Sequence, residues 1–102
     1  MQRHLTLSDA ARADLESARR WLRQPGAGPR AAARLATIRD AVRDLRQHPC
    51  RWPVGDHPGV RERTVGGYRI AYEVRPDTGR DATAGDVDVL RVFAPRQDRS
   101  DL

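Results

Sequence analysis

Residues 58–75 read PGVRERTVGGYRIAYEVR, and residues 87–99 read VDVLRVFAPRQDR. The first stretch ends in eight residues with a tyrosine or aliphatic side chain at every second position, which is typical of a strand with one buried face. The pair Gly66-Gly67 precedes this run, and both glycines can take the positive φ that a two-residue hairpin turn requires. The two stretches therefore predict three β-strands, at residues 60–65, 68–75 and 87–93, the first two joined as a hairpin.

Arginines recur along these strands. If Ile70 and Tyr72 face a core, the residues between them face solvent, and we expect arginines of all three strands to share that open face. Such a face is a natural site for phosphate or carboxylate partners, because the planar fork of arginine binds both groups in a bidentate manner. A merely solvated face in an arginine-rich protein is the alternative interpretation. The predicted arginine face consists of Arg61, Arg63, Arg69, Arg91 and Arg96.

Two amphipathic helices are predicted upstream of the strands, at residues 8–23 and 29–47. Their apolar residues recur every three or four positions, which is the spacing of one buried helix face. Ser8 is a good N-cap for the first helix, and Trp21 lies beside the apolar stripe of that helix. The short break QPGAGP between the helices makes them an antiparallel hairpin. The stripe of the second helix consists of Ala31, Leu35, Ile38, Val42 and Leu45.

The remaining segments complete the expected fold. Residues 2–7 are predicted as a short strand, residues 48–59 as a loop that Trp52 anchors to the core, and residues 76–86 as a polar, mobile loop. The order is then β-α-α-β-β-β, which predicts an α+β domain. In it, the helical hairpin packs on one face of a mostly antiparallel sheet and the other face stays open. At 102 residues, the whole chain is expected to form one domain, residues 1–102.

Composition limits the classes of function. The net charge is +5, and all 19 basic residues are arginines, which favours acidic partners such as nucleic acid or an acidic protein segment. The single cysteine, Cys50, excludes an internal disulfide, and the three histidines are scattered, so that no metal site or other cofactor is expected. Cys50 is interpreted as a buried or incidental thiol. Without an apolar run of about 18 residues or a signal sequence, no membrane association is expected and a cytoplasmic location is predicted.

The strand region resembles the C-terminal half of the RelE/ParE superfamily of bacterial type II toxins. The resemblance is carried by GYRIAY at residues 67–72, VLRV at residues 89–92 and PGVR at residues 58–61. With the chain length and the two upstream helices, it covers nearly the whole chain. It implies the compact fold of that superfamily and the toxin role in a type II toxin–antitoxin system. It also implies a cognate antitoxin whose C-terminal helix and tail wrap the toxin in a hetero-oligomeric complex.

The superfamily contains two activities: RelE-like members cut mRNA on the ribosome, and ParE-like members poison DNA gyrase. Arg61, Arg63, Arg69 and Arg96 match the basic positions of RelE-like enzymes. RNA cleavage also needs a group that moves protons, and arginine is a poor base because it stays protonated. Here Ala94 stands where many members have a histidine, and residues 97–102 contain neither His nor Tyr. The ParE-like, non-enzymatic interpretation is favoured, and a ribosome-dependent mRNA endoribonuclease is the alternative.

A third interpretation is a small basic module that binds nucleic acid directly. Aromatic residues make up only 5% of the chain, and Tyr68 and Tyr72 are expected on the buried face of their strand. Because platforms for base stacking need exposed aromatic rings, the sequence disfavours this interpretation.

Overall fold

The structure is a computed structural model that describes residues 2–95. The elements follow the predicted order β-α-α-β-β-β, and the residue range predicted for the strand of residues 68–75 is confirmed. Each helix ends slightly before the last residue that the sequence predicts for it. In chain order the elements are β1 (Leu5–Leu7), α1 (Asp9–Leu22), α2 (Gly28–Asp44), β2 (Arg61–Val65), β3 (Tyr68–Arg75) and β4 (Asp86–Phe93).

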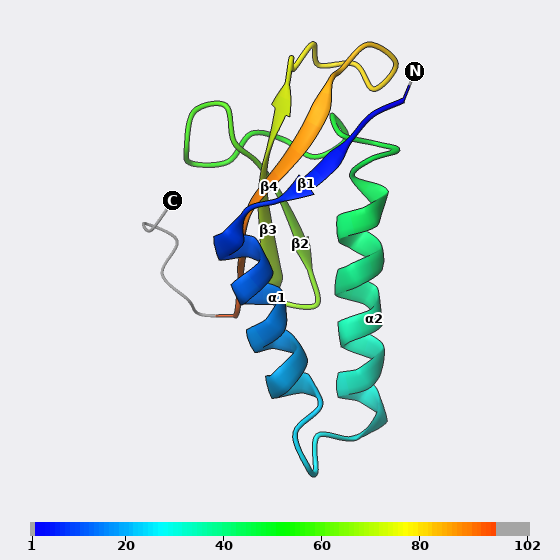
Figure 1. The fold of residues 1–102 in the computed structure, drawn as a ribbon, viewed down its shortest axis with the longest axis vertical. Coiled ribbons are helices and arrows are strands. Elements are labelled where there is room, and N and C mark those ends of the chain that lie inside the picture. Colours follow the sequence, from blue (N-terminus) through cyan, green and yellow to red (C-terminus); the bar gives the residue numbers. More distant parts are fainter. Residues whose placement is uncertain (1, 96–102) are drawn as a thin grey trace.

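The four strands form one sheet in the order β1-β4-β3-β2. Strand β1 pairs with β4 in parallel, and the other two pairings are antiparallel. The helical hairpin lies along one face of this sheet and extends past its lower end (Figure 1). The predicted α+β class, with a hairpin on a mostly antiparallel sheet, is confirmed. No helix in the described part of the chain is long and apolar enough to span a membrane.

Local sequence features fix where these elements begin and turn. The Ser8 hydroxyl accepts a hydrogen bond from the Ala11 N–H at 3.0 Å and donates one to the Leu90 carbonyl at 2.7 Å. It therefore caps α1 and ties the start of the helix to β4. In the turn between β2 and β3, Gly66 and Gly67 have φ values of 56° and 83°, as the hairpin prediction required.

The core lies between the hairpin and the sheet. Four of the five residues in the predicted stripe of α2 and the turn after it are buried, and Ala31 is partly buried against the same cluster. On the sheet side, the core is formed by Tyr72 and Ile70, whose side chains are both fully buried. Burial of these apolar surfaces supplies the main favourable free energy of folding.

One prediction about the periphery of the sheet is wrong, and another is confirmed in part. The second face of the sheet is not left open, because Val60, Ala71 and Phe93 form a small buried cluster there. Residues 76–85 form the predicted loop between β3 and β4, in which the Gly85 N–H bonds the Pro76 carbonyl at 2.9 Å and Ala84 is fully buried, and the mobility of this loop stays a prediction. Short-range hydrogen bonds close this segment into a compact turn that packs on the rest of the domain.

Candidate docking site on the helical hairpin

The predicted arginine face does not form, because the strand register divides its members. Arg61 lies opposite Tyr72 and Arg63 lies opposite Ile70, so both side chains point to the core side of the sheet. Arg69 is on the other side, where it pairs in register with Thr64. Arg91 lies opposite Ala71 and shares the face of Arg69. Arg96 lies outside the described residues.

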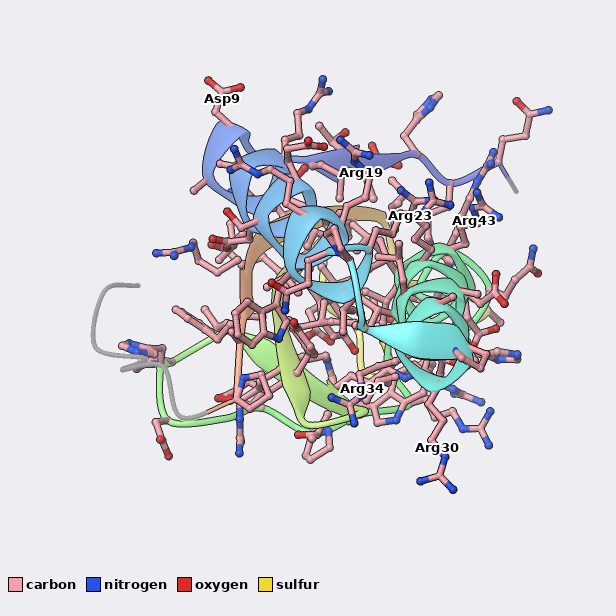
Figure 2. All side chains as sticks on the ribbon, turned by 90° about the horizontal axis from the view of Figure 1, so that it is seen from below. Asp9, Arg19, Arg23, Arg30, Arg34 and Arg43 are labelled. Carbon is pink, nitrogen blue, oxygen red and sulfur yellow. The ribbon has the colours of Figure 1, made fainter. Side chains whose placement is uncertain are left out.

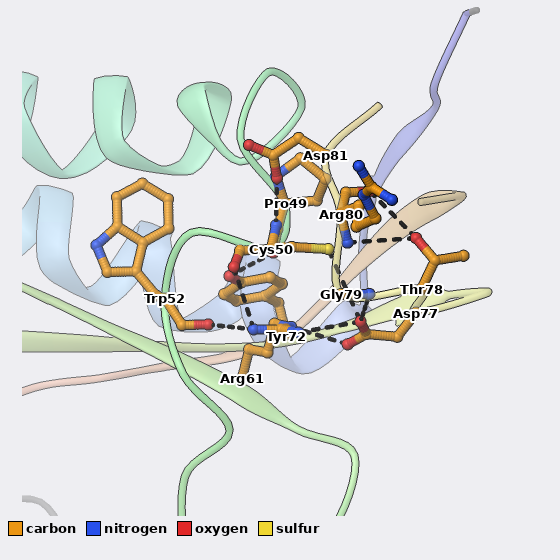
Figure 3. A network of polar contacts seen from close by, with 10 residues as sticks. All are labelled: Pro49, Cys50, Trp52, Arg61, Tyr72, Asp77, Thr78, Gly79, Arg80 and Asp81. Carbon is orange, nitrogen blue, oxygen red and sulfur yellow. Dashed lines mark hydrogen bonds and ion pairs between the residues drawn. The ribbon is translucent and has the colours of Figure 1, made fainter. Parts of the chain in front are cut away.

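Arg61 is the centre of a clasp between two loops, which Figure 3 shows. Its guanidinium donates to both carboxylate oxygens of Asp77, at 2.8 and 3.0 Å, and to the Trp52 carbonyl at 2.6 Å. The hydrogen bond and charge of Arg61 hold the pKa of Asp77 below its usual range. We call Cys50, Trp52, Arg61, Tyr72 and Asp77 the Arg61 clasp.

The other members of the clasp are also engaged in internal contacts. The Tyr72 hydroxyl donates to the Pro49 carbonyl at 2.8 Å, and burial raises the pKa of this phenol. The Cys50 sulfur lies 3.7 Å from an Asp77 oxygen, and burial, followed by the charge of Asp77, raises the pKa of the thiol. A raised pKa keeps this thiol protonated and unreactive at neutral pH. The Arg61 clasp is therefore a structural element that joins the loops around residues 50 and 77.

The remaining described arginines of the predicted face are paired as well. Arg63 bonds the Ala41 carbonyl at 3.0 Å and lies 3.9 Å from the centroid of the Trp52 ring. Arg91 donates to both oxygens of Asp14, at 2.7 and 3.1 Å. Arg69 pairs with Glu62 at a longer distance, 3.3 Å, and 38% of its side chain is exposed. Each cation has a carboxylate or carbonyl partner, so these residues do not form an open anion site, and their role in binding an antitoxin or target stays a prediction.

The ion pair of the Arg61 clasp gives a pH prediction. Because the pKa of Asp77 is lowered in the folded chain, its ionised form contributes stability above the unfolded pKa, about 3.9. This contribution is lost as the pH falls through the folded pKa. We expect the Asp77→Asn variant to be less stable than the wild type at pH 7, with a difference that shrinks on acidification below about pH 4. Urea unfolding across a pH series measures it, and a constant difference would contradict the assignment.

A groove that the sequence did not predict lies beside α1. Trp21 is 64% exposed, whereas the other large apolar side chains of α1, Leu15 and Leu22, are partly or fully buried. The groove next to it has a volume of about 500 Å³ and runs between α1 and the ends of β3 and β4. Ala18, Tyr68 and Val92 form its apolar floor. We call this hollow the Trp21 groove, and it is lined by Asp14, Ser17, Ala18, Trp21, Tyr68, Val92, Ala94 and Pro95.

Polar groups at the Trp21 groove complement its apolar floor. The Tyr68 hydroxyl forms no hydrogen bond with another described residue, and burial raises the pKa of this phenol, which stays a neutral donor. Asp14 already accepts from Arg91 and from the Val92 N–H at 2.8 Å. On the other side of Trp21, a smaller hollow of about 270 Å³ is bordered by Arg30 and Arg34. The surface thus combines an apolar slot, an aromatic ridge and nearby cations.

A helical hairpin on one face of a small, mostly antiparallel four-stranded sheet is the architecture that the RelE/ParE resemblance implied. The family described as the ParE toxin of the type II toxin–antitoxin system parDE matches residues 5–99, and the chain belongs to this family. A solved structure, the chromosomal ParDE TA system from P. aeruginosa, matches with a TM-score of 0.67 at 19% sequence identity. The match covers 93% of this chain and 98% of that chain, and shows the shared fold. No curated protein matches this sequence.

Proposed function

We propose that this chain, a ParE-family toxin of a type II toxin–antitoxin system, inhibits growth in the cytoplasm by poisoning DNA gyrase. Membership of the ParE family is the observation that carries this proposal. The pairing of the arginines supports it. A ribonuclease needs cations that can turn to a reacting phosphate, whereas Arg61 and Arg63 are held by Asp77 and Asp44.

The alternative, a ribosome-dependent mRNA endoribonuclease, retains one supporting observation. Arg69 lies on the face away from the helices and is partly exposed, so its guanidinium could leave Glu62 and contact a phosphate. Tyr68 and Tyr72, the only tyrosines, are both buried, which leaves neither ring open to a substrate base.

Mapping the 5′ ends of mRNA after brief induction tests the two functions against each other. For a gyrase poison we expect a DNA-damage response and no discrete cuts in translated frames. Arg69→Ala should then change toxicity little. For a nuclease, Arg69→Ala should remove most of the cuts, since removing one donor that stabilises the transition state costs about 10²- to 10³-fold in rate. Cuts that disappear in a folded Arg69→Ala variant would overturn the gyrase proposal.

The cognate antitoxin is proposed to neutralise the toxin by occupying the Trp21 groove. The floor of Ala18, Tyr68 and Val92 suits an apolar side chain of a partner helix or strand. The Tyr68 hydroxyl suits a backbone or carboxylate acceptor of the antitoxin. An aromatic side chain at the rim of a pocket is also the residue type that dominates binding energy in protein interfaces.

A further inference from the structure

The far end of the helical hairpin has an uneven charge distribution. Residues 17–39 contain six arginines and no aspartate or glutamate. They form the second half of α1, the connecting loop and most of α2, and they include the end of the hairpin that extends past the sheet in Figure 1. We call residues 17–39 the hairpin tip. Its net charge exceeds that of the whole chain, which is +5.

Most of this charge is not neutralised by other residues that the structure describes. The side chains of Arg23, Arg30 and Arg34 are exposed and form no hydrogen bond or ion pair with another described residue. Only Arg19 reaches a carboxylate, that of Glu16 at 2.6 Å, just before the hairpin tip. By contrast, Arg61 and Arg91 in the sheet form close ion pairs with Asp77 and Asp14. The cations of the hairpin tip are therefore available to an external anion.

The shape of the hairpin tip separates these cations into two groups. Figure 2, which looks at the hairpin from its tip, shows Arg30 and Arg34 on one side of the connecting loop and Arg19 and Arg23 on the other. The loop between the two helices reads RQPGA, at residues 23–27, and is short. A Cβ atom added at Gly26 or Gly28 would meet nothing within 4 Å, so the apex is surrounded by open space. A slender apex is thus flanked by guanidiniums on both sides.

We propose that the hairpin tip binds duplex DNA, with its apex in the major groove and its arginines on the phosphates of both flanking strands. The major groove is about 12 Å wide and admits an α-helix or a two-stranded β-ribbon. Guanidiniums on opposite sides of the apex match the two phosphate walls of that groove. An acidic protein segment fits less well at the apex, because residues 23–29 include none of the large apolar or aromatic side chains that a protein interface needs at its centre.

The inference goes beyond the proposed function and does not depend on gyrase being the target. It also predicts the type of recognition. Proline, glycine and alanine at the apex offer few groups that could read base edges, whereas the arginines contact only phosphate. Binding is therefore independent of sequence, and its affinity falls steeply with salt as counterions return to the DNA.

Fluorescence anisotropy with the purified full chain and a short labelled duplex tests this inference. The triple variant Arg23→Gln, Arg30→Gln and Arg34→Gln is compared with a control triple variant of equal charge, Arg12→Gln, Arg51→Gln and Arg80→Gln, whose arginines are exposed outside the hairpin tip. For the tip variant we expect the slope of log K against log salt to decrease by about 2 to 3, near 0.9 for each phosphate that is no longer neutralised. At about 50 mM salt its affinity should fall at least about tenfold, while the control variant stays within about threefold of the wild type.

Competition identifies the partner. Two duplexes of unrelated sequence should bind equally, and single-stranded DNA of the same length should bind more weakly than either. If the control variant lost as much affinity for the duplex as the tip variant, net charge alone would explain the binding, and the proposal would be overturned. Tighter binding of single-stranded DNA would overturn the groove geometry. Poly-glutamate and unlabelled duplex are compared as competitors at equal concentrations of negative charge. If poly-glutamate displaces the labelled duplex at the lower concentration, the hairpin tip binds an acidic protein instead. Unfolding curves verify that every variant is folded.

Discussion

Replacing Trp21 with alanine is expected to weaken binding of the cognate antitoxin by about 30-fold or more. Trp21 forms the wall of the Trp21 groove, and 64% of its surface is exposed in the unbound chain. Truncation of a tryptophan at the centre of an interface typically costs about 2 kcal/mol or more, which is about 30-fold in the dissociation constant. Isothermal titration of the wild type and the variant with the antitoxin measures the change.

The control for this prediction is Arg20→Ala, which changes an exposed neighbour on α1 outside the lining of the groove. We expect this variant to bind the antitoxin within a few-fold of the wild type. Because Trp21 is exposed, Trp21→Ala should alter the free energy of unfolding by less than about 1 kcal/mol. In cells, antitoxin co-expression should rescue growth from the control but not from Trp21→Ala, provided that the latter remains toxic. An unchanged dissociation constant for Trp21→Ala would place the antitoxin elsewhere.

The second large effect is on stability: Arg61→Ala is expected to lower the free energy of unfolding by roughly 2 to 4 kcal/mol. Only 12% of the Arg61 side chain is exposed, and it bonds Asp77 and the Trp52 carbonyl. Its removal leaves a carboxylate and a carbonyl without their donor in a partly buried site. That loss approaches the cost of breaking a fully buried pair. Urea denaturation followed by far-UV circular dichroism measures the change.

Arg75→Ala is the matched control, because Arg75 also forms ion pairs, with Glu73 and Asp88, but 65% of its side chain is exposed. Exposed pairs contribute about 0 to 1 kcal/mol, so this variant should stay close to the wild type. Equal losses in the two variants would show that the Arg61 clasp contributes no more than a surface ion pair. If Arg61→Ala removed toxicity but left the free energy of unfolding unchanged, the residue would act in function rather than in folding.

Much of the fold follows from sequence patterns that report directly on burial. The alternation in residues 68–75 gives β3 its limits, since Tyr72 and Ile70 are fully buried and Arg75 is exposed. Ser8 is the N-cap of α1, because its side chain accepts a hydrogen bond from a backbone N–H in the first turn that has no partner within the helix. These features depend on a few neighbouring residues, so the sequence alone predicts them. The parallel pairing of β1 with β4 joins segments that lie far apart in the sequence and has no local signal.

The error in the arginine face has a geometric cause. A two-residue turn at Gly66-Gly67 places Val65 opposite Tyr68, and cross-strand partners share a face. Counting back from that pair puts Arg63 with Ile70, on the core side. The turn length in the sequence could have revealed this. The partners of Arg61 could not be foreseen, because Asp77 comes from a loop whose folded path depends on the whole domain.

The Trp21 groove was missed for a different reason. A helical stripe tells which residues face the core, and Trp21 lies beside that stripe, but the pattern does not show whether a neighbouring element covers it. In the structure, Trp21 borders an uncovered groove between α1 and the ends of β3 and β4, which is a tertiary feature without a local signal. The acid-free run of residues 17–39 is visible in the sequence. Its meaning depends on the structure, which leaves three of its arginines without a partner among the described residues.

The most direct test of the proposed function uses purified DNA gyrase, supercoiled plasmid and this toxin. The proposal predicts that adding the toxin traps gyrase on cleaved DNA, so that linear plasmid accumulates after denaturation of the enzyme. Prior addition of the antitoxin should prevent this accumulation for the wild type, and should fail to do so for Trp21→Ala. If the toxin stops growth in cells but produces no linear plasmid with active gyrase at any concentration, the assignment of gyrase as the target is contradicted.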